Sequence, residues 1–284
     1  MDVNDVNEVL FGLGQKDLLP EGPLFKFLST APGQTPDWKE RVTQLLDGKA
    51  YLPSPNQFND PFDCLPRMGI PSSVEEFAKG REVFIDRIQK AVPDHPRAEI
   101  EEMIDYLVAN GQLDSLAHVS RNAFNKGGAL MGVFCLCECA ENVLMWSHYA
   151  NNHQGLALRF RFNRFEDNAL LPLWKVKYQE QRPVLMKFFS GGNYQFAFIE
   201  ALCTKADFWK YEQEWRYINP GAAGTVVEFN PNVIDAVILG AKISQEDAVW
   251  MTDLAKSRNL AIMHVRPEQE TFALSFDGLW KPPL

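Results

Sequence analysis

The stretch from Met145 to Gly155, MWSHYANNHQG, gathers side chains that can do chemistry. It holds a Trp, a Tyr, two His and three amide side chains within eleven residues. Histidine exchanges a proton near neutral pH, and an aromatic ring can stack on a planar ligand. Side chains at element ends often carry function because a scaffold positions them and leaves them accessible. We therefore predict that His148 and Tyr149 are catalytic, that Trp146 helps to bind a cofactor, and that His153 fixes the turn into the next strand.

A second stretch rich in ionisable and aromatic side chains is YEQEWRYI at residues 211–218. If it is extended from Glu212 to Ile218, the side chains of Glu212, Glu214 and Arg216 share one face. One interpretation is a surface ladder of ion pairs, which adds little stability. The other is a carboxylate that Arg216 holds ionised, ready to stabilise positive charge in a substrate. On that second interpretation Glu212 and Glu214 are catalytic and Arg216 supports cofactor binding.

A third stretch, FNDPFD at residues 58–63, predicts a rigid polar loop. Pro61 fixes its φ angle, while Asn59 and Asp60 can hydrogen-bond to the neighbouring backbone. Rigid polar loops line binding sites, so Asn59 and Asp60 are candidates for cofactor binding. The alternative is that both residues only cap a turn.

Composition excludes several classes of protein. The 284 residues carry 28 Lys plus Arg against 37 Asp plus Glu, a formal net charge of −9, so a broad surface for duplex nucleic acid is not expected. No apolar run is long enough to span a membrane, and the N-terminus has no signal-peptide pattern, so we expect a cytoplasmic protein without membrane contact. The five Cys are an odd number, which favours free thiols. Cys135, Cys137 and Cys139 alternate as in a strand, but no CxxC pair accompanies them, so no metal is expected.

Hydrophobic periodicity predicts a single α+β domain over residues 1–284. Between residues 72 and 126 the pattern is helical and carries no compact set of chemical side chains, which indicates a helical insertion. An amphipathic segment is predicted at residues 6–11, and a short helix at 141–151. Strands are expected at residues 24–28, 50–52, 132–138, 155–162, 173–178, 212–218, 225–229, 236–239, 260–267 and 271–276.

These motifs resemble a bacterial family of unknown function. LFKFLS, FNDPFD, FCLCE, LMWSHYANNHQGLALRF, WKYEQEWRYI and AVILGAKIS occur in this order between residues 24 and 265. They are similar to the family signatures FNDPFE, MWSHYA followed by H and G, E.EWR and ILG. Asp63 stands where Glu is commoner, and Phe25 where Tyr is frequent. The resemblance indicates which residues matter and implies no activity.

More distantly, the order of residues is similar to that of ADP-ribosyltransferase-like folds, which are split, mostly antiparallel α+β sheets that grip NAD in a cleft. Such folds place a polar residue on a first strand, an aromatic further on, and a Glu on a late strand. Here Lys26, then Tyr51 or Tyr149, then Glu212 or Glu214 stand in that order. The resemblance implies that Lys26 and Tyr51 help to bind NAD, which would be the substrate. Lys26 replaces the His or Arg that most of these enzymes have.

Three functions follow from these observations. The first is an NAD-consuming ADP-ribosyltransferase or NAD glycohydrolase, acting as a toxin or a phage-defence effector, with a nucleotide or other small molecule as substrate and an unidentified macromolecular acceptor. The second is a hydrolase or nuclease that uses His148 and His153 with Asp60 or Glu212. The third is a non-enzymatic sensor or interaction module, in which these three stretches of sequence only pack against one another.

Overall fold

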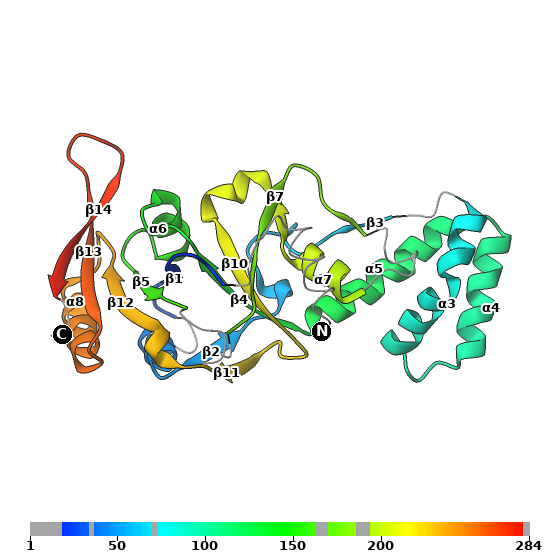
Figure 1. The fold of residues 1–284 in the computed structure, drawn as a ribbon, viewed down its shortest axis with the longest axis horizontal. Helices are drawn as coiled ribbons and strands as arrows, with labels where there is room; N and C mark the ends of the chain where they lie inside the picture. Colours follow the sequence, from blue (N-terminus) through cyan, green and yellow to red (C-terminus); the bar gives the residue numbers. More distant parts are fainter. Residues whose placement is uncertain (1–18, 34–36, 70–72, 163–169, 186–193, 281–284) are drawn as a thin grey trace.

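A computed structural model describes residues 19–33, 37–69, 73–162, 170–185 and 194–280. Its centre is an eight-stranded sheet of order β14-β13-β12-β5-β1-β4-β10-β6 (Figure 1). Within this sheet only β12 and β13 pair in parallel, so the predicted mixed, mostly antiparallel sheet with helices is confirmed. The amphipathic segment predicted at residues 6–11 lies outside the described residues. The strands are β1 (Leu24–Leu28), β4 (Met131–Cys137), β5 (Leu156–Phe160), β6 (Leu173–Lys175), β10 (Glu214–Pro220), β12 (Ile234–Leu239), β13 (Ala261–Pro267) and β14 (Leu274–Trp280).

The other strands of the described residues form three two-stranded sheets. They join β2 (Lys49–Leu52) to β11 (Thr225–Glu228), β3 (Arg67–Met68) to β8 (Val184–Leu185), and β7 (Lys177–Gln179) to β9 (Thr204–Ala206). None of the helices in the described part of the chain combines the length and apolar character that crossing a membrane requires.

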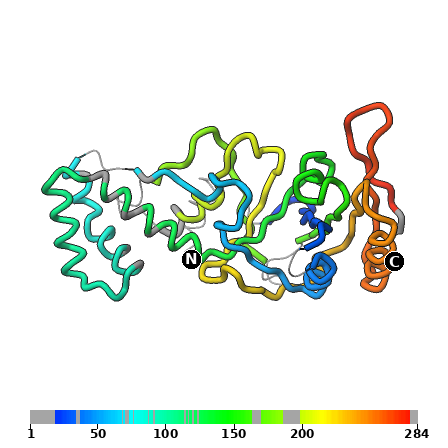
Figure 2. Tube along the Cα trace, turned by 180° about the vertical axis from the view of Figure 1, so that it is seen from behind, coloured from blue at the N-terminus to red at the C-terminus, as the bar shows by residue number. Residues whose placement is uncertain are grey.

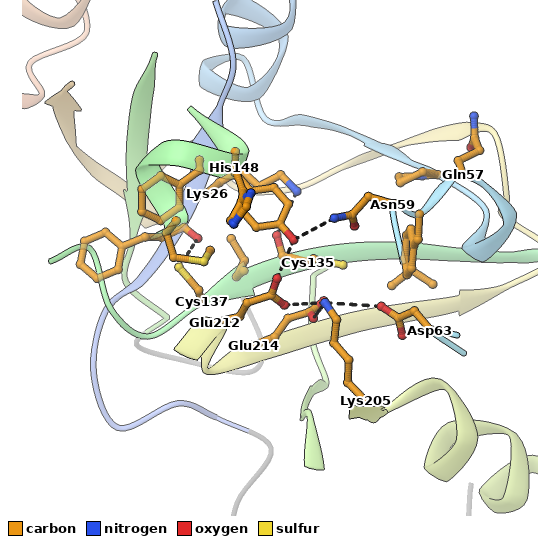
Figure 3. A pocket seen from close by; sticks show the side chains of 18 residues that line it. Lys26, Gln57, Asn59, Asp63, Cys135, Cys137, His148, Lys205, Glu212 and Glu214 are labelled. Carbon is orange, nitrogen blue, oxygen red and sulfur yellow. Dashed lines mark hydrogen bonds and ion pairs between the residues drawn. The ribbon is translucent and has the colours of Figure 1, made fainter. Parts of the chain in front are cut away.

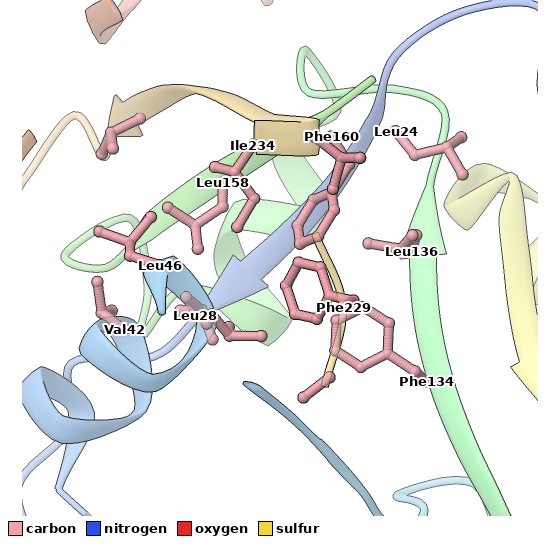
Figure 4. Close-up of a cluster of buried hydrophobic side chains, with 14 of the residues drawn as sticks. Leu24, Leu28, Val42, Leu46, Phe134, Leu136, Leu158, Phe160, Phe229 and Ile234 are labelled. Carbon is pink, nitrogen blue, oxygen red and sulfur yellow. The ribbon is translucent and has the colours of Figure 1, made fainter. Parts of the chain in front are cut away.

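The larger hydrophobic core lies on one face of the eight-stranded sheet, under α2 (Trp38–Leu46) and α8 (Gln245–Ser257) (Figure 4). Figure 2 shows the backbone of these two helices from behind, α2 in blue and α8 in orange. The alternation of β5 explains it, since Leu156, Leu158 and Phe160 are fully buried there. Arg159 points to the other side, where its Nε donates to Asp235 Oδ1 at 2.6 Å. The strand thus turns its large apolar side chains to the core and Arg159 to the opposite face.

The opposite face of the sheet carries the short helix α6 (Val143–Tyr149). Its Trp146 is fully buried and donates through the indole N–H to the carbonyl of Ala140 at 2.7 Å. The same ring meets Phe27 of β1 edge-on, with 5.0 Å between ring centroids. Trp146 thus anchors α6 to the sheet and fixes the direction in which the rest of the helix points.

The eight-stranded sheet is almost divided at its middle. β1 pairs with β5 along all of its residues but meets β4 only at Phe25 opposite Cys137. Beyond that pair the ammonium of Lys26 donates to the carbonyl of Cys135 at 3.0 Å and lies 4.6 Å from the centroid of the Phe134 ring. A side chain thus supplies a donor where the backbone ladder stops, and an opening forms between two central strands.

Three helices, α3 (Val74–Ala91), α4 (Arg97–Ala109) and α5 (Leu113–Ala129), occupy the segment for which a helical insertion is predicted, and they lie to one side of the sheet (Figure 1). α3 and α4 contribute a hydrophobic cluster of their own, whereas Phe124 of α5 stacks on Phe198 with 4.3 Å between centroids. The helix α5 continues through Gly127 and Gly128, three residues beyond the predicted end of the helical segment at residue 126. A Cβ at Gly127 would lie 2.9 Å from the Phe198 ring, so glycine permits this close packing.

Residues 173–178 do not form the single predicted strand. The chain changes partners at Val176, whose N–H donates to the Glu214 carbonyl at 2.9 Å, while the next N–H, of Lys177, donates to Cys203 at 2.8 Å. The segment before this point joins the large sheet as β6, and the segment after it pairs with β9 as β7. Sequence alternation cannot reveal such a switch because both halves keep the same period.

A tight turn joins α6 to β5. Asn151, Asn152 and His153 have positive φ angles of 47°, 53° and 69°. The N–H of Gly155 then donates to the Ala150 carbonyl at 2.7 Å, and a Cβ on Gly155 would lie 2.2 Å from the carbonyl oxygen of Leu28. Only glycine permits this approach, which seats the end of α6 on β1.

We predict that Gly155→Ala lowers the free energy of unfolding by at least about 1–3 kcal/mol, because the new methyl group collides with backbone that cannot move freely. The control is Gly278→Ala in β14, where a Cβ would meet no atom within 4 Å. Urea unfolding of both variants measures the difference. Equal stability of the two variants would show that the α6 turn tolerates a side chain.

Candidate functional site

A pocket of about 410 Å³ lies at the opening between β1 and β4, on the sheet face that carries α6 (Figure 3). Its volume lies within the roughly 300–1,000 Å³ that is typical of small-molecule sites. The three stretches singled out in the sequence, residues 145–155, 211–218 and 58–63, all contribute to its wall. The apolar lining includes Phe25, Phe27, Phe58, Val133, Cys137 and Met145, and the polar lining includes Lys26, Asn59, Asp63, His148, Tyr149, Lys205, Glu212 and Glu214.

Glu212 and Tyr149 are joined by a short hydrogen bond inside this pocket. The Tyr149 hydroxyl donates to Glu212 Oε1 at 2.5 Å, and the Asn59 amide donates to the same hydroxyl at 3.5 Å. Glu212 does not begin a strand as predicted. It ends the 3₁₀ segment η3 (Asp207–Glu212), and Gln213 then takes a left-handed φ of 47° before β10 begins at Glu214. This kink brings both carboxylates to the pocket.

Five charged side chains form a cluster in the wall of the pocket, from here on the buried charge cluster; four of them line the pocket (Figure 3), and Arg216 lies behind them. Arg216 donates to both oxygens of Asp63, at 3.0 and 2.7 Å, and to both oxygens of Glu214, at 2.8 and 2.9 Å. The ammonium of Lys205 donates to Glu212 and, at 3.1 Å, to Glu214, and lies 3.5 Å from Asp63. Arg216 is fully buried, and Glu212 and Glu214 are 2% and 5% exposed, so the surface ladder considered for these residues is wrong.

The cluster shifts the pKa values of its two glutamates in opposite directions. Burial by itself raises the pKa of Glu214, but the charges of Arg216 and Lys205 outweigh it and hold that pKa far below the ordinary value. Burial also raises the pKa of Glu212, and there the single charge of Lys205 does not reverse the effect. Burial and the nearby Glu212 carboxylate raise the pKa of Tyr149, which keeps its hydroxyl protonated as a donor. Glu214 is thus fixed as an anion, whereas Glu212 is the carboxylate that can exchange a proton.

His148 stands exposed at the mouth of the pocket among aromatic rings. Its ring centroid lies 6.2 Å from that of Trp209, 6.4 Å from Tyr211 and 6.3 Å from Tyr149. His153, by contrast, faces Ser147 Oγ with its Nε2 at 3.2 Å and does not line this pocket. The pair of histidines that a hydrolase would use is therefore not brought together, whereas the turn into β5 does contain His153.

Four predicted ligand-binding residues lie elsewhere. Tyr51 is 47% exposed because β2 pairs with β11 rather than with the large sheet, and alternation turns its ring to solvent. Trp146 is a core anchor of α6. Arg216 lies behind the pocket, where it holds carboxylates rather than a ligand. Asp60 faces a second pocket, described below, and its Oδ1 accepts from the Phe62 N–H at 2.8 Å as a turn cap does.

Sequence reasoning missed Lys205 and gave Asp63 no role. Lys205 lies on β9 between buried Thr204 and half-buried Ala206, so a lysine inside an apolar run was the available signal. A charged residue in such a run needs a buried counter-charge. Asp63 ends the FNDPFD loop, and nothing local indicates that its partner is Arg216, 153 residues away.

The five cysteines are free thiols, as the odd number indicates. Cys137 and Cys203 are buried, and burial raises the pKa of each thiol above its ordinary value, so they pack as small hydrophobic side chains. Within the described ranges no group of three His, Cys, Asp or Glu side chains has a geometry that could hold a metal ion.

Comparison with known proteins gives one match. Residues 145–217, from α6 into β10, match the model of a family described as a protein of unknown function (DUF2971). No curated protein and no solved structure matches the chain. The matched segment contains His148, Tyr149, Lys205, Glu212 and Glu214, which line the pocket, together with Arg216 behind it.

The buried charge cluster predicts a large effect of removing Arg216. Arg216→Met leaves Asp63 and Glu214 buried with one cation fewer, and we expect the free energy of unfolding to fall by about 3–5 kcal/mol. The control is Arg97→Met, since Arg97 pairs with Glu82, Asp86 and Glu101 on the surface of the insertion, where such pairs contribute about 0–1 kcal/mol. Urea unfolding measures both. A loss no greater than that of the control would contradict the assignment of Arg216 as the neutralising charge.

Proposed function

We propose that this chain cleaves the N-glycosidic bond of NAD or a closely related nucleotide, as a glycohydrolase or an ADP-ribosyltransferase. The observation that carries the proposal is the placement of Glu212. It is a buried carboxylate with a raised pKa, hydrogen-bonded to Tyr149, at the wall of a pocket with aromatic and apolar sides. Such a carboxylate suits a reaction in which positive charge develops on a sugar.

The chemistry assigns a part to each side chain. The bond between C1′ of the ribose and the nicotinamide nitrogen breaks, and its electron pair leaves on nicotinamide. Glu212 stabilises the positive charge on C1′, and the oxygen of water, or an acceptor nucleophile, forms the new bond and releases its proton to Glu212 or to solvent. The rings of Tyr149 and His148 offer faces on which the planar base can stack.

Glu212 rather than Glu214 is the catalytic carboxylate in this proposal. Both oxygens of Glu214 accept hydrogen bonds from Arg216, and Oε2 also accepts one from Lys205. Little acceptor capacity remains for a substrate. Lys205 and Glu214 are positioning residues, since they set the charge and place of Glu212 without needing to touch the ligand.

We expect wild-type protein to release nicotinamide from NAD, measured by liquid chromatography, and Glu212→Gln to lose roughly 10²–10³-fold in kcat, as when one transition-state-stabilising group is removed. Binding of NAD by the variant should persist, because the amide keeps the size of the side chain. The control is Glu138→Gln, which removes a half-buried carboxylate paired with Lys175 and Trp215 outside the pocket. Folded wild-type protein that neither binds nor cleaves NAD, alone or with a cell extract as acceptor, would contradict the proposal and favour a non-enzymatic module.

The raised pKa of Glu212 predicts a shifted acid limb in the pH profile. The reaction needs ionised Glu212, so kcat/KM has its maximal value above the pKa of this carboxyl group and falls as the pH drops through that pKa. Because the pKa is raised, this fall should occur at a pH above the ordinary glutamate pKa of about 4.3. Tyr149→Phe removes a hydrogen bond that lowers this pKa, so the limb should move to higher pH while the ring remains for stacking. A limb at the same pH in both proteins would assign the titration to another group.

A further inference from the structure

A second pocket, of about 480 Å³, lies next to the first and shares Phe58 and Asp63 with it. It is formed between the FNDPFD loop and the C-terminal half of α5, so one of its walls belongs to the helical insertion. Phe58, Leu65, Phe124 and Leu202 give it apolar sides. None of the described residues along it is Lys, Arg or His.

Asp60 supplies the chemical character of this pocket. Its side chain lines the pocket, the residue is only 6% exposed, and Oδ1 caps the turn at Phe62. The other oxygen, Oδ2, is buried and accepts no hydrogen bond from the described residues. A buried carboxylate oxygen without a donor is costly, so it favours any ligand that brings a positive charge or an N–H group. The neighbouring Asp63 has both oxygens bonded to Arg216, which leaves Asp60 as the uncompensated charge.

Gly128 gives an independent indication that this space is kept open. Glycine inside a helix costs about 1 kcal/mol relative to alanine, so it usually has a packing reason. At Gly127 that reason is the Phe198 ring, which a Cβ would meet at 2.9 Å. Gly128 is also buried and lines the second pocket, but a Cβ there would meet no atom within 4 Å. Its missing side chain therefore relieves no clash and instead widens the pocket.

We propose that this second pocket binds a small organic cation, an ammonium or guanidinium group on an apolar body, with the cationic head against Asp60 Oδ2. The head satisfies the buried carboxylate, and the apolar body contacts the rings of Phe58 and Phe124. The site shares Phe58 and Asp63 with the first pocket but does not depend on the reaction proposed there.

Calorimetric titration tests the proposal with three probes of similar shape, butylamine, butylguanidine and the neutral butylurea. At least one of the two cations should bind the wild-type protein, and butylurea should bind at least about tenfold more weakly. Asp60→Asn keeps the oxygen that caps the turn and removes the charge, so it should weaken cation binding by at least about tenfold. Binding of neither cation, or equal binding of butylurea, would overturn the proposal and leave a pocket that holds water only.

Three further variants keep the test decisive if Asp60→Asn unfolds. Gly128→Leu should weaken cation binding because its side chain takes up part of the space in the pocket, whereas Gly128→Ala should retain binding and the wild-type melting temperature or a higher one. Glu212→Gln should bind the cation as wild type does, so failure at the nucleotide pocket and failure here are distinguishable. Undiminished binding by Gly128→Leu would place the cation elsewhere and overturn the proposal.

Discussion

The buried charge cluster is the constraint on which the site depends. It contains the carboxylates of Asp63, Glu212 and Glu214 and the cations Lys205 and Arg216, so full ionisation would leave one negative charge in excess. Buried charge must be paired, and the excess falls on the carboxylate that is held least strongly. That carboxylate is Glu212, which accepts no hydrogen bond from Arg216 and instead accepts one from the Tyr149 hydroxyl. The charge balance of the cluster therefore determines which carboxylate of the pocket can exchange a proton.

The same cluster ties distant parts of the chain together. Asp63 comes from the FNDPFD loop, Lys205 from β9, Glu212 from the end of η3, and Glu214 and Arg216 from β10. Arg216 also donates to the carbonyl of Leu202, at the end of α7 (Tyr194–Leu202), at 2.5 Å. These contacts fix the loop and the 3₁₀ segment against the sheet at the place where β1 and β4 separate. A pocket at a sheet opening needs such support, because the backbone ladder no longer holds its walls together.

The helices and strands were largely predictable from periodicity, whereas the contacts between the side chains of the pocket were not. β5 and α2 follow their apolar patterns, and His148, Tyr149, Asn59, Glu212 and Glu214 do line one pocket. Local pattern could not show that Glu212 lies outside the strand, because the left-handed turn at Gln213 depends on tertiary contacts. The burial of Trp146 and the exposure of Tyr51 depend on which neighbour each element packs against. The pairing of Lys205 with three carboxylates is likewise a property of the assembled sheet.

The FNDPFD loop joins the two pockets, and through the second pocket it connects the first to the helical insertion. Asn59 faces the first pocket, Asp60 faces the second pocket, and Phe58 and Asp63 belong to both walls. Consecutive side chains of a rigid loop point in different directions, so one short segment can serve two cavities. The far wall of the second pocket is α5, whose Phe124 is stacked on Phe198 of α7. The insertion is thus continuous with the site through the last turns of one helix, while α3 and α4 form their own small core away from it.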